Sequence, residues 1–145
     1  GLSLAPIGAY LAVTGAFHWL PVLFSLAVVF WVSGFDIIYA LQDESFDKSN
    51  DLYSMPVWLG KAKALRMSEL LHVCSAALVV TAGIYGGFGN WYWIGVVIFI
   101  GMLIYQHRLV KPNDLSKVNI AFMTANGFAS VLFAIFVIAD LVQRG

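Results

Sequence analysis

Three aspartates at the end of a long apolar stretch have the clearest capacity for chemistry in this sequence. Asp36, Asp43 and Asp47 stand at positions i, i+7 and i+11, with Tyr39 and Ala40 between them. In an α-helix these steps turn about 700° and about 1100°, each within about 20° of whole turns, so the carboxylates share one face. Like charges on one face repel each other unless a cation or proton lies between them. We call these three residues the aspartate stripe, and it predicts a divalent metal site with the oxygen ligands that Mg²⁺ prefers.

Two other interpretations of the aspartate stripe are open. It can be a solvated acidic helix end, since Asp43 and Asp47 can simply face water. Asp36 argues against this, because a charge inside an apolar segment costs about 2.5–3.5 kcal/mol on insertion scales. Intramembrane carboxylates also serve proton and ion pathways. The stripe alone therefore does not choose between an enzyme and an ion-coupled transporter subunit with Asp36 as its coupling site.

The composition indicates an integral membrane protein. The chain has 145 residues, of which 61% are hydrophobic and only 11% charged, and its mean hydropathy is +0.84. So small a globule cannot hide that much apolar surface. A net charge of zero without a basic stripe gives no case for nucleic-acid binding. The single cysteine, Cys74, lies in an apolar run and is expected to be a small buried hydrophobic residue.

The apolar residues form five segments, which predict an all-α, polytopic membrane helix bundle. The first is too short to span a bilayer comfortably, as if cut, whereas the others are near the ~20 residues that a crossing requires. No signal peptide is recognisable, and the chain opens directly inside an apolar segment. We therefore expect it to be the C-terminal piece of a longer protein. The segments run approximately over Leu2–Thr14, Trp19–Leu41, Ala64–Tyr85, Trp91–Tyr105 and Val118–Val142.

The distribution of basic residues predicts the orientation of these segments. Seven of the eight Lys and Arg residues fall in or beside the connections after the second and fourth segments, and only Arg144 lies elsewhere. In an alternating topology these two connections share one side, which the positive-inside bias makes cytoplasmic. The aspartate stripe opens to the same side, and the C-terminus is expected on the opposite side.

The long connection after the aspartate stripe brings cations close to the carboxylates. Pro56 and Gly60 punctuate it, and Lys61, Lys63 and Arg66 follow. One possibility is a lid that clamps an anionic ligand with these cations. The alternative is that they are ordinary basic residues beside the membrane, which only set the orientation of the helices. For any single lysine this explanation is at least as good.

Other polar residues in the apolar segments are better explained by structure than by chemistry. They can hydrogen-bond between helices or line a pocket, and no phosphate-binding loop or nucleophile elbow accompanies them. These residues are Glu69, His72, Gln106, His107, Arg108, Asn119 and Asn126.

With these residues in place, the sequence resembles the UbiA-type intramembrane prenyltransferases over essentially its whole length. The pattern Asp36-x-x-Tyr39-Ala40-x-x-Asp43-x-x-x-Asp47 looks like the second aspartate-rich motif of that family. Further similarities place it closest to the branch that prenylates 4-hydroxybenzoate. They lie in Gly1–Gly15, in Ser54-x-Pro56-x-x-Leu59-Gly60, in Gln106-His107 through Val110, Pro112, Asp114 and Leu115, and in the stretch from Asn119 to Asn126.

The resemblance implies a fold and a reaction. Family members have nine transmembrane helices around a cavity open to cytoplasm and lipid, and two aspartate-rich motifs hold Mg²⁺ against the diphosphate of a polyprenyl diphosphate. Departure of pyrophosphate leaves an allyl cation, which an electron-rich aromatic ring attacks. Residues 1–145 would then be the C-terminal half, helices five to nine, of an enzyme of the bacterial inner membrane. Its partners would be the lipid bilayer, both substrates and an N-terminal half that carries the first motif.

The resemblance also implies roles for individual residues. Asp36, Asp43 and Asp47 correspond to the metal-binding and catalytic carboxylates, with Tyr39 beside them in the motif. Lys61, Lys63 and Arg66 are candidates for contact with the diphosphate. The aromatic acceptor stays open between 4-hydroxybenzoate and a dihydroxynaphthoate, the precursors of ubiquinone-type and menaquinone-type products. A non-catalytic membrane scaffold on the same fold is a further alternative.

Overall fold

The computed structural model describes residues 1–43, 49–51 and 55–145, apart from the side chains of Asp43, Met55, Pro56, Thr124 and Ala125. Within these ranges the chain is a bundle of helices. The helices are η1 Leu2–Leu4, α1 Ala5–Thr14, α2 Trp19–Ala40, η2 Leu41–Asp43, α4 Met55–Leu59, α5 Lys61–Tyr85, α6 Asn90–Leu109, α7 Val118–Ala121, η3 Phe122–Phe128 and α8 Ala129–Arg144.

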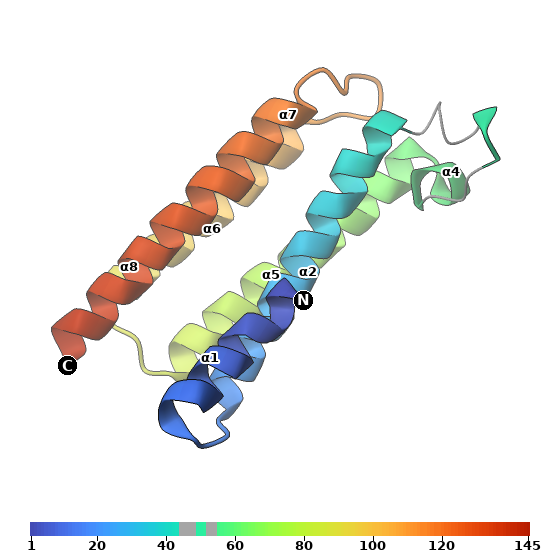
Figure 1. Ribbon diagram of the computed structural model, residues 1–145. Coiled ribbons are helices and arrows are strands. Elements are labelled where there is room, and N and C mark those ends of the chain that lie inside the picture. The colour runs from blue at the N-terminus through green and yellow to red at the C-terminus, as the bar shows by residue number, and fades with distance from the viewer. Residues whose placement is uncertain (44–48, 52–54) are drawn as a thin grey trace.

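Two antiparallel helix pairs make up the bundle. Helix α2 packs along α5, and α6 packs along α8, while α1 lies against α2 (Figure 1). The α1–α2 and α5–α6 turns and the C-terminus are at one end (Figure 1). The end of α2, the start of α5 and the connection from α6 to α7 are at the other end, which we call the loop end (Figure 1).

The helix lengths confirm a polytopic, all-α membrane bundle. Four stretches are long and apolar enough to cross a bilayer: Trp19–Ala40, Lys61–Tyr85, Asn90–Leu109 and Val118–Arg144. The first segment, Leu2–Thr14, is a shorter apolar helix, as its sequence predicted.

The start of α5 and the last apolar segment depart from the sequence prediction. Helix α5 begins at Lys61, three residues before the predicted start at Ala64, so Lys61 and Lys63 belong to its first turn. The last segment is not one continuous α-helix, because residues Phe122–Phe128 form a π-helical segment, η3, between α7 and α8. Hydropathy indicates the length of an apolar segment but not its hydrogen-bond pattern, so it could not predict the π-helical segment.

Three side chains of α5 hydrogen-bond to backbone carbonyls of α2. Ser68 Oγ donates to the Gly34 carbonyl at 2.7 Å, and Ser75 Oγ donates to the Ala27 carbonyl at 2.8 Å. Between them, His72 Nε2 lies 3.1 Å from the Trp31 carbonyl. The residue numbers of the carbonyls decrease along α2 while those of the side chains increase along α5, as is expected of an antiparallel pair. We call these three contacts the α2–α5 polar seam, and they fix the register of the two helices.

A hydrophobic cluster holds the loop end together. Its buried members come from the end of α2, the start of α5, the end of α6 and the α7 helix, so four segments meet at one place. They are Ile37, Ile38, Leu41, Ala64, Leu65, Val110, Val118 and Ala121. We call this set the loop-end cluster, and it sets the position of α7 beside the end of α2.

The loop between α6 and α7 is closed by its own polar groups. Lys111 and Asp114 exchange two backbone hydrogen bonds of 3.2 and 3.1 Å. The Asp114 carboxylate accepts hydrogen bonds from the Ser116 hydroxyl at 2.6 Å and from the Ser116 amide at 3.1 Å. These bonds, the hydroxyl first, lower the pKa of Asp114 below its usual range. The carboxylate is therefore charged at neutral pH and keeps the loop folded just before α7.

Gly34 is the point of closest approach in the α2–α5 polar seam. A Cβ atom at this position would clash with the imidazole of His72, with Cδ2 at 2.5 Å. We expect Gly34→Ala to destabilise the protein by about 1–3 kcal/mol, the usual cost of overpacking a core. Reversible unfolding of the native-length protein in mixed micelles measures this change.

Gly101→Ala is the matched control, because a Cβ on this α6 glycine would meet nothing within 4 Å. We expect it to change stability by less than about 0.5 kcal/mol or to stabilise the helix slightly. Equal stabilities for the two variants would contradict the close approach at Gly34.

Candidate functional site

Asp36 lines an open pocket at the loop end, with a volume of about 600 Å³. One wall is the end of α2, which contributes Asp36, Tyr39 and Ala40, and the facing wall comes from α7 and the start of η3. The facing residues are Asn119, Phe122 and Met123. Both Asp36 and Asn119 are exposed, so a carboxylate and a carboxamide are accessible to a ligand in the same pocket.

The helical continuity of α2 places the three α2 residues on one wall. Residues i, i+3 and i+4 lie on one face of an α-helix, and α2 stays α-helical through Ala40. On the opposite face of α2 the loop-end cluster includes Ile37 and Ile38, which are 7% and 2% exposed. Burial of one face therefore turns Asp36 and Tyr39 outward into the pocket.

Aromatic contacts join the two walls of the pocket. The Phe122 ring lies 5.5 Å from the Tyr39 ring and 6.0 Å from the Phe35 ring, measured between centroids. Tyr39 is 48% exposed and Phe122 is 37% exposed, so part of each ring faces the pocket. The site thus combines oxygen ligands with the exposed parts of aromatic rings.

The wall opposite Asp36 leaves α-helical geometry where the pocket is formed. The π-helical segment η3 begins at Phe122 and ends at Phe128, and it contains Asn126 and Gly127. The hydroxyl of Ser130 donates to the Asn126 carbonyl at 2.5 Å and lies 3.1 Å from the Gly127 carbonyl. It thereby supplies a hydrogen bond to backbone carbonyls of the π-helical segment. Short π-helical segments inside α-helices are frequent at functional sites.

The structure places the aspartate stripe only in part. Helix α2 ends at Ala40, and Leu41–Asp43 form a 3₁₀ helix, so the continuous α-helix assumed for the stripe holds for residues 36–40. A 3₁₀ helix turns about 120° per residue, whereas an α-helix turns about 100°. Over Leu41–Asp43 this difference rotates position 43 by about 60° from the place that a continuous α-helix would give it. The Asp43 side chain and all of Asp47 lie outside the described part of the chain.

The three candidate cations lie at the same end but do not line the Asp36 pocket. Lys61, Lys63 and Arg66 belong to the first two turns of α5, whose next residues, Ala64 and Leu65, pack in the loop-end cluster. Lys63 and Arg66 are exposed. Among the described residues, no group of three His, Cys, Asp or Glu side chains could hold a metal ion.

Asn119 is the pocket residue whose position the sequence did not reveal. We expected Asn119 and Asn126 to be interhelical hydrogen-bond partners or pocket lining, with a structural role as the better explanation. Asn119 faces the Asp36 pocket. The available signal was its place one residue after the start of α7, directly beyond a polar loop that returns to the loop end.

Comparison with known proteins identifies relatives over nearly the whole chain. A 4-hydroxybenzoate octaprenyltransferase of Francisella tularensis subsp. tularensis (strain WY96-3418) is 28% identical over 140 residues, which are 94% of this chain and 48% of that protein. The protein of the same name from Nitrosomonas europaea is 29% identical over 126 residues, 87% of this chain and 43% of that protein. The chain therefore spans about half the length of these relatives. No solved structure matches it.

The family model agrees with these relatives. The model of the UbiA prenyltransferase family matches residues 1–137 of the 145-residue chain. This span covers α1, α2, both walls of the Asp36 pocket and most of α8. The chain belongs to the UbiA prenyltransferase family.

Proposed function

We propose that this chain contributes the Asp36 pocket to a membrane enzyme that transfers a polyprenyl group from a polyprenyl diphosphate to an aromatic acceptor. The observation that carries the proposal is the exposed Asp36 carboxylate facing Asn119 across a pocket at the loop end of a UbiA-family membrane bundle. We propose 4-hydroxybenzoate as the acceptor, because the relatives are named 4-hydroxybenzoate octaprenyltransferases. A dihydroxynaphthoate is the alternative acceptor.

The donor set of the pocket fits Mg²⁺. This cation takes oxygen ligands and is typically held by only one or two protein carboxylates together with waters and substrate phosphates. Asp36 would hold it, with Asp43 and Asp47 as the other carboxylates of the motif and the Asn119 amide oxygen within the same pocket. Bound Mg²⁺ would neutralise the negative charge that develops on the departing diphosphate.

The apolar and aromatic walls suit the other product of bond cleavage. When the carbon–oxygen bond to the diphosphate breaks, the prenyl group becomes an allyl cation and the bonding electrons leave with the diphosphate. The exposed faces of Tyr39 and Phe122 can stabilise this cation through their ring quadrupoles. The acceptor ring then donates its electron pair to the cation and loses a proton to solvent, which restores its aromaticity.

The location of the pocket suits the two substrates. The bundle spans the membrane, and an isoprenoid tail partitions into its lipid. We propose that the loop end faces the cytoplasm, because most Lys and Arg residues lie at this end in sequence, and that the membrane is the bacterial inner membrane. The C-terminus is then on the outer side. The chain would act as the C-terminal half, residues 1–145, with an N-terminal half that completes the site.

Replacement of Asp36 tests the proposal. We expect Asp36→Asn to lower prenyl transfer about a hundredfold or more, because a neutral amide loses most of the electrostatic stabilisation of the leaving diphosphate. The assay uses membranes with the native-length protein, a short prenyl diphosphate, and 4-hydroxybenzoate or a dihydroxynaphthoate. An EDTA sample run beside the Mg²⁺ sample should show no product.

Asp51→Asn is the matched control for Asp36→Asn. Asp51 is exposed and has a positive φ of 53°, a conformation that asparagine also adopts readily. We expect it to keep wild-type activity. Transfer by the Asp36→Asn protein at the wild-type rate, or undiminished transfer in EDTA, would contradict the proposal.

Two substitutions at Tyr39 separate its ring from its hydroxyl. We expect Tyr39→Phe to retain most of the activity and Tyr39→Ala to lower kcat about 5–30-fold, the rate equivalent of a desolvated cation–π contact. Tyr105→Ala, at an exposed α6 tyrosine outside the pocket, is the control and should remain near wild type. A Phe variant as slow as the Ala variant would instead assign the function to the hydroxyl group.

Neutralisation of the cations in the first turns of α5 tests contact with the diphosphate. We expect Arg66→Gln or Lys63→Gln to raise the KM for prenyl diphosphate about tenfold if the cation is a charge-assisted partner of the phosphate oxygens. Lys117→Gln, an equivalent loss of charge at the start of α7, is the control. Equal KM values in all three variants would contradict contact with the diphosphate, and the cations would then serve only to orient the helices in the membrane.

A further inference from the structure

A second pocket, of about 370 Å³, opens between α5 and α6. These two helices follow each other in the chain, yet α5 packs mainly along α2 and α6 mainly along α8. The space between the two helix pairs is therefore only partly filled by side chains. The volume of the pocket falls within the range of small-molecule sites, which combine apolar walls with a few polar groups.

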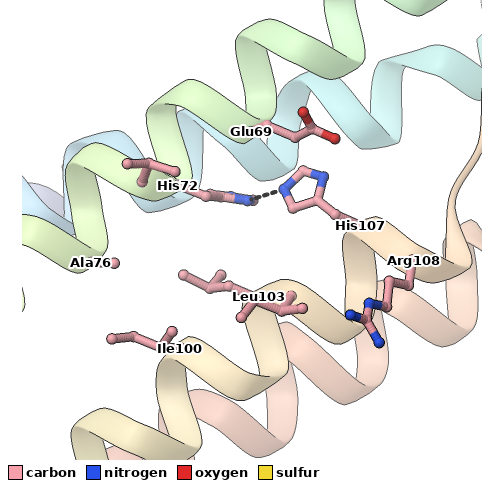
Figure 2. A pocket seen from close by; sticks show the side chains of 9 residues that line it. Glu69, His72, Ala76, Ile100, Leu103, His107 and Arg108 are labelled. Atoms are coloured by element: carbon pink, nitrogen blue, oxygen red, sulfur yellow. Dashed lines mark hydrogen bonds between the residues drawn. The ribbon is translucent and has the colours of Figure 1, made fainter.

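Opposite charges stand on the two walls of this second pocket. Figure 2 shows Glu69 on the α5 side and Arg108 on the α6 side, both toward the end of the pocket that lies away from Ala76 and Ile100. Both charged side chains are exposed, and neither forms an ion pair within the part of the chain that the structure describes. The pocket thus offers one carboxylate and one guanidinium group to a ligand that enters from outside.

The two charges lie at nearly the same depth in the membrane. The rings of His72 and His107 have centroids 4.9 Å apart, so these residues mark one level of the two helices. Glu69 precedes His72 on α5 and Arg108 follows His107 on α6, so both charges lie on the loop-end side of that level. The two steps amount to about 4.5 Å and about 1.5 Å of helix. Because α6 ends at Leu109, this level is near the boundary of the bilayer.

An apolar lining leads from this level toward the middle of the membrane. It consists of Val73 and Ala76 on α5 and of Ile100, Leu103 and Ile104 on α6. The helix length from Glu69 to Ala76, or from Arg108 back to Ile100, is about 10–12 Å. Half of a hydrocarbon core is about 15 Å thick. Val73 and Ile104 are 64% and 51% exposed, so the apolar lining is accessible from the side of the bundle.

We propose that the second pocket binds a phospholipid with a primary ammonium headgroup, as in phosphatidylethanolamine. The ammonium group donates hydrogen bonds to the Glu69 carboxylate, and Arg108 pairs with the phosphate. One acyl chain follows the apolar lining from Val73 and Ile104 to Ala76. The headgroup then lies at the boundary of the bilayer and the chain points toward its middle, as in the surrounding lipid.

The pair of opposite charges selects this headgroup. A lipid with a net negative headgroup is attracted to Arg108 and repelled by Glu69. A quaternary ammonium group carries the positive charge but has no N–H to donate to a carboxylate. Of these three headgroup types, the primary ammonium lipid alone satisfies both side chains. Basic pockets between transmembrane helices bind lipid headgroups in other membrane proteins.

The second pocket is separate from the Asp36 pocket. The two share no lining residue. The Phe35 ring lies between them, with its centroid 5.2 Å from that of His72 and 6.0 Å from that of Phe122. A segment that completes the Asp36 pocket therefore need not cover the second one. The inference requires a membrane-spanning bundle and does not depend on the proposed reaction.

Native mass spectrometry of the native-length protein in detergent micelles tests the inference. The protein is titrated with phosphatidylethanolamine, phosphatidylcholine or phosphatidylglycerol that carry identical acyl chains. We expect the wild type to bind phosphatidylethanolamine about fivefold more tightly than either other lipid, the equivalent of one good ion pair at a partly exposed site. This comparison requires no substitution.

Two substitutions then assign the contacts. We expect Glu69→Gln to weaken the binding of phosphatidylethanolamine about fivefold and to remove its advantage over phosphatidylcholine. Arg108→Gln should weaken all three lipids, because each has a phosphate. Both side chains are exposed, so their replacement leaves the fold intact. Glu69→Lys places two cations at the pocket and should make phosphatidylglycerol the preferred lipid.

Matched controls and a photoreactive lipid locate the binding. Asp51→Asn and Lys111→Gln each remove one charge from an exposed position outside the pocket and should bind as the wild type does. Asp36→Asn should also keep the lipid preference, because its carboxylate lies in the other pocket. A phosphatidylethanolamine with a diazirine in the upper half of one acyl chain should form adducts at residues 73–76 and 100–104 after irradiation.

The inference is overturned if the wild type binds the three lipids equally, or if Glu69→Gln and Arg108→Gln leave their relative affinities unchanged. Adducts confined to other segments would also overturn it. Adducts on an N-terminal half without any on α5 or α6 would show that protein, and not lipid, covers the second pocket. Loss of the preference in Asp36→Asn would place the lipid in the Asp36 pocket and refute the assignment.

Discussion

The antiparallel contact between α2 and α5 is the constraint on which the rest of this structure depends. In a bilayer the hydrophobic effect does not press helices together, so close packing and hydrogen bonds must fix their register. Ser68, His72 and Ser75 do this by bonding to three carbonyls of α2. Each bond is worth only about 0.6 kcal/mol on average, but a slip of α5 along α2 would separate all three donors from their acceptors. The seam therefore contributes more to register than to stability.

That register determines the height of Asp36 and the direction of the His72 ring. Asp36 lies two residues beyond Gly34, whose carbonyl accepts from Ser68, so the seam sets the height of the carboxylate relative to the first turns of α5. The loop-end cluster then brings α7 to the same height, and the π-helical segment turns Phe122 toward Tyr39. On the other side, the bond from His72 to the Trp31 carbonyl leaves its Nδ1 atom facing α6. One helix pair thus orients a carboxylate on one side and an imidazole on the other.

The sequence predicted the elements well because apolar length and charged boundaries are local properties. The four spanning helices, the short first helix and Asp36 at an accessible helix face follow from such patterns. The π-helical segment and the 3₁₀ helix at Leu41–Asp43 do not, since they depend on how neighbouring segments pack. Asn119 and His107 were identified as polar residues, but the groups that they face belong to other helices. Their partners are distant in sequence, so spacing along one helix carried no signal for them.

Phe35 protects a nucleophilic side chain from the proposed reaction, because its ring lies between His72 and Phe122. An allyl cation reacts with any accessible lone pair, and imidazole nitrogens are good nucleophiles. His72 is close to the Asp36 pocket in space, yet Phe35 covers it from that side. Both ring nitrogens of His72 also have polar neighbours, Nε2 the Trp31 carbonyl at 3.1 Å and Nδ1 the Gln106 and His107 side chains at 2.7 Å. A cation formed in the proposed reaction would therefore meet the rings of Tyr39 and Phe122 rather than an imidazole lone pair.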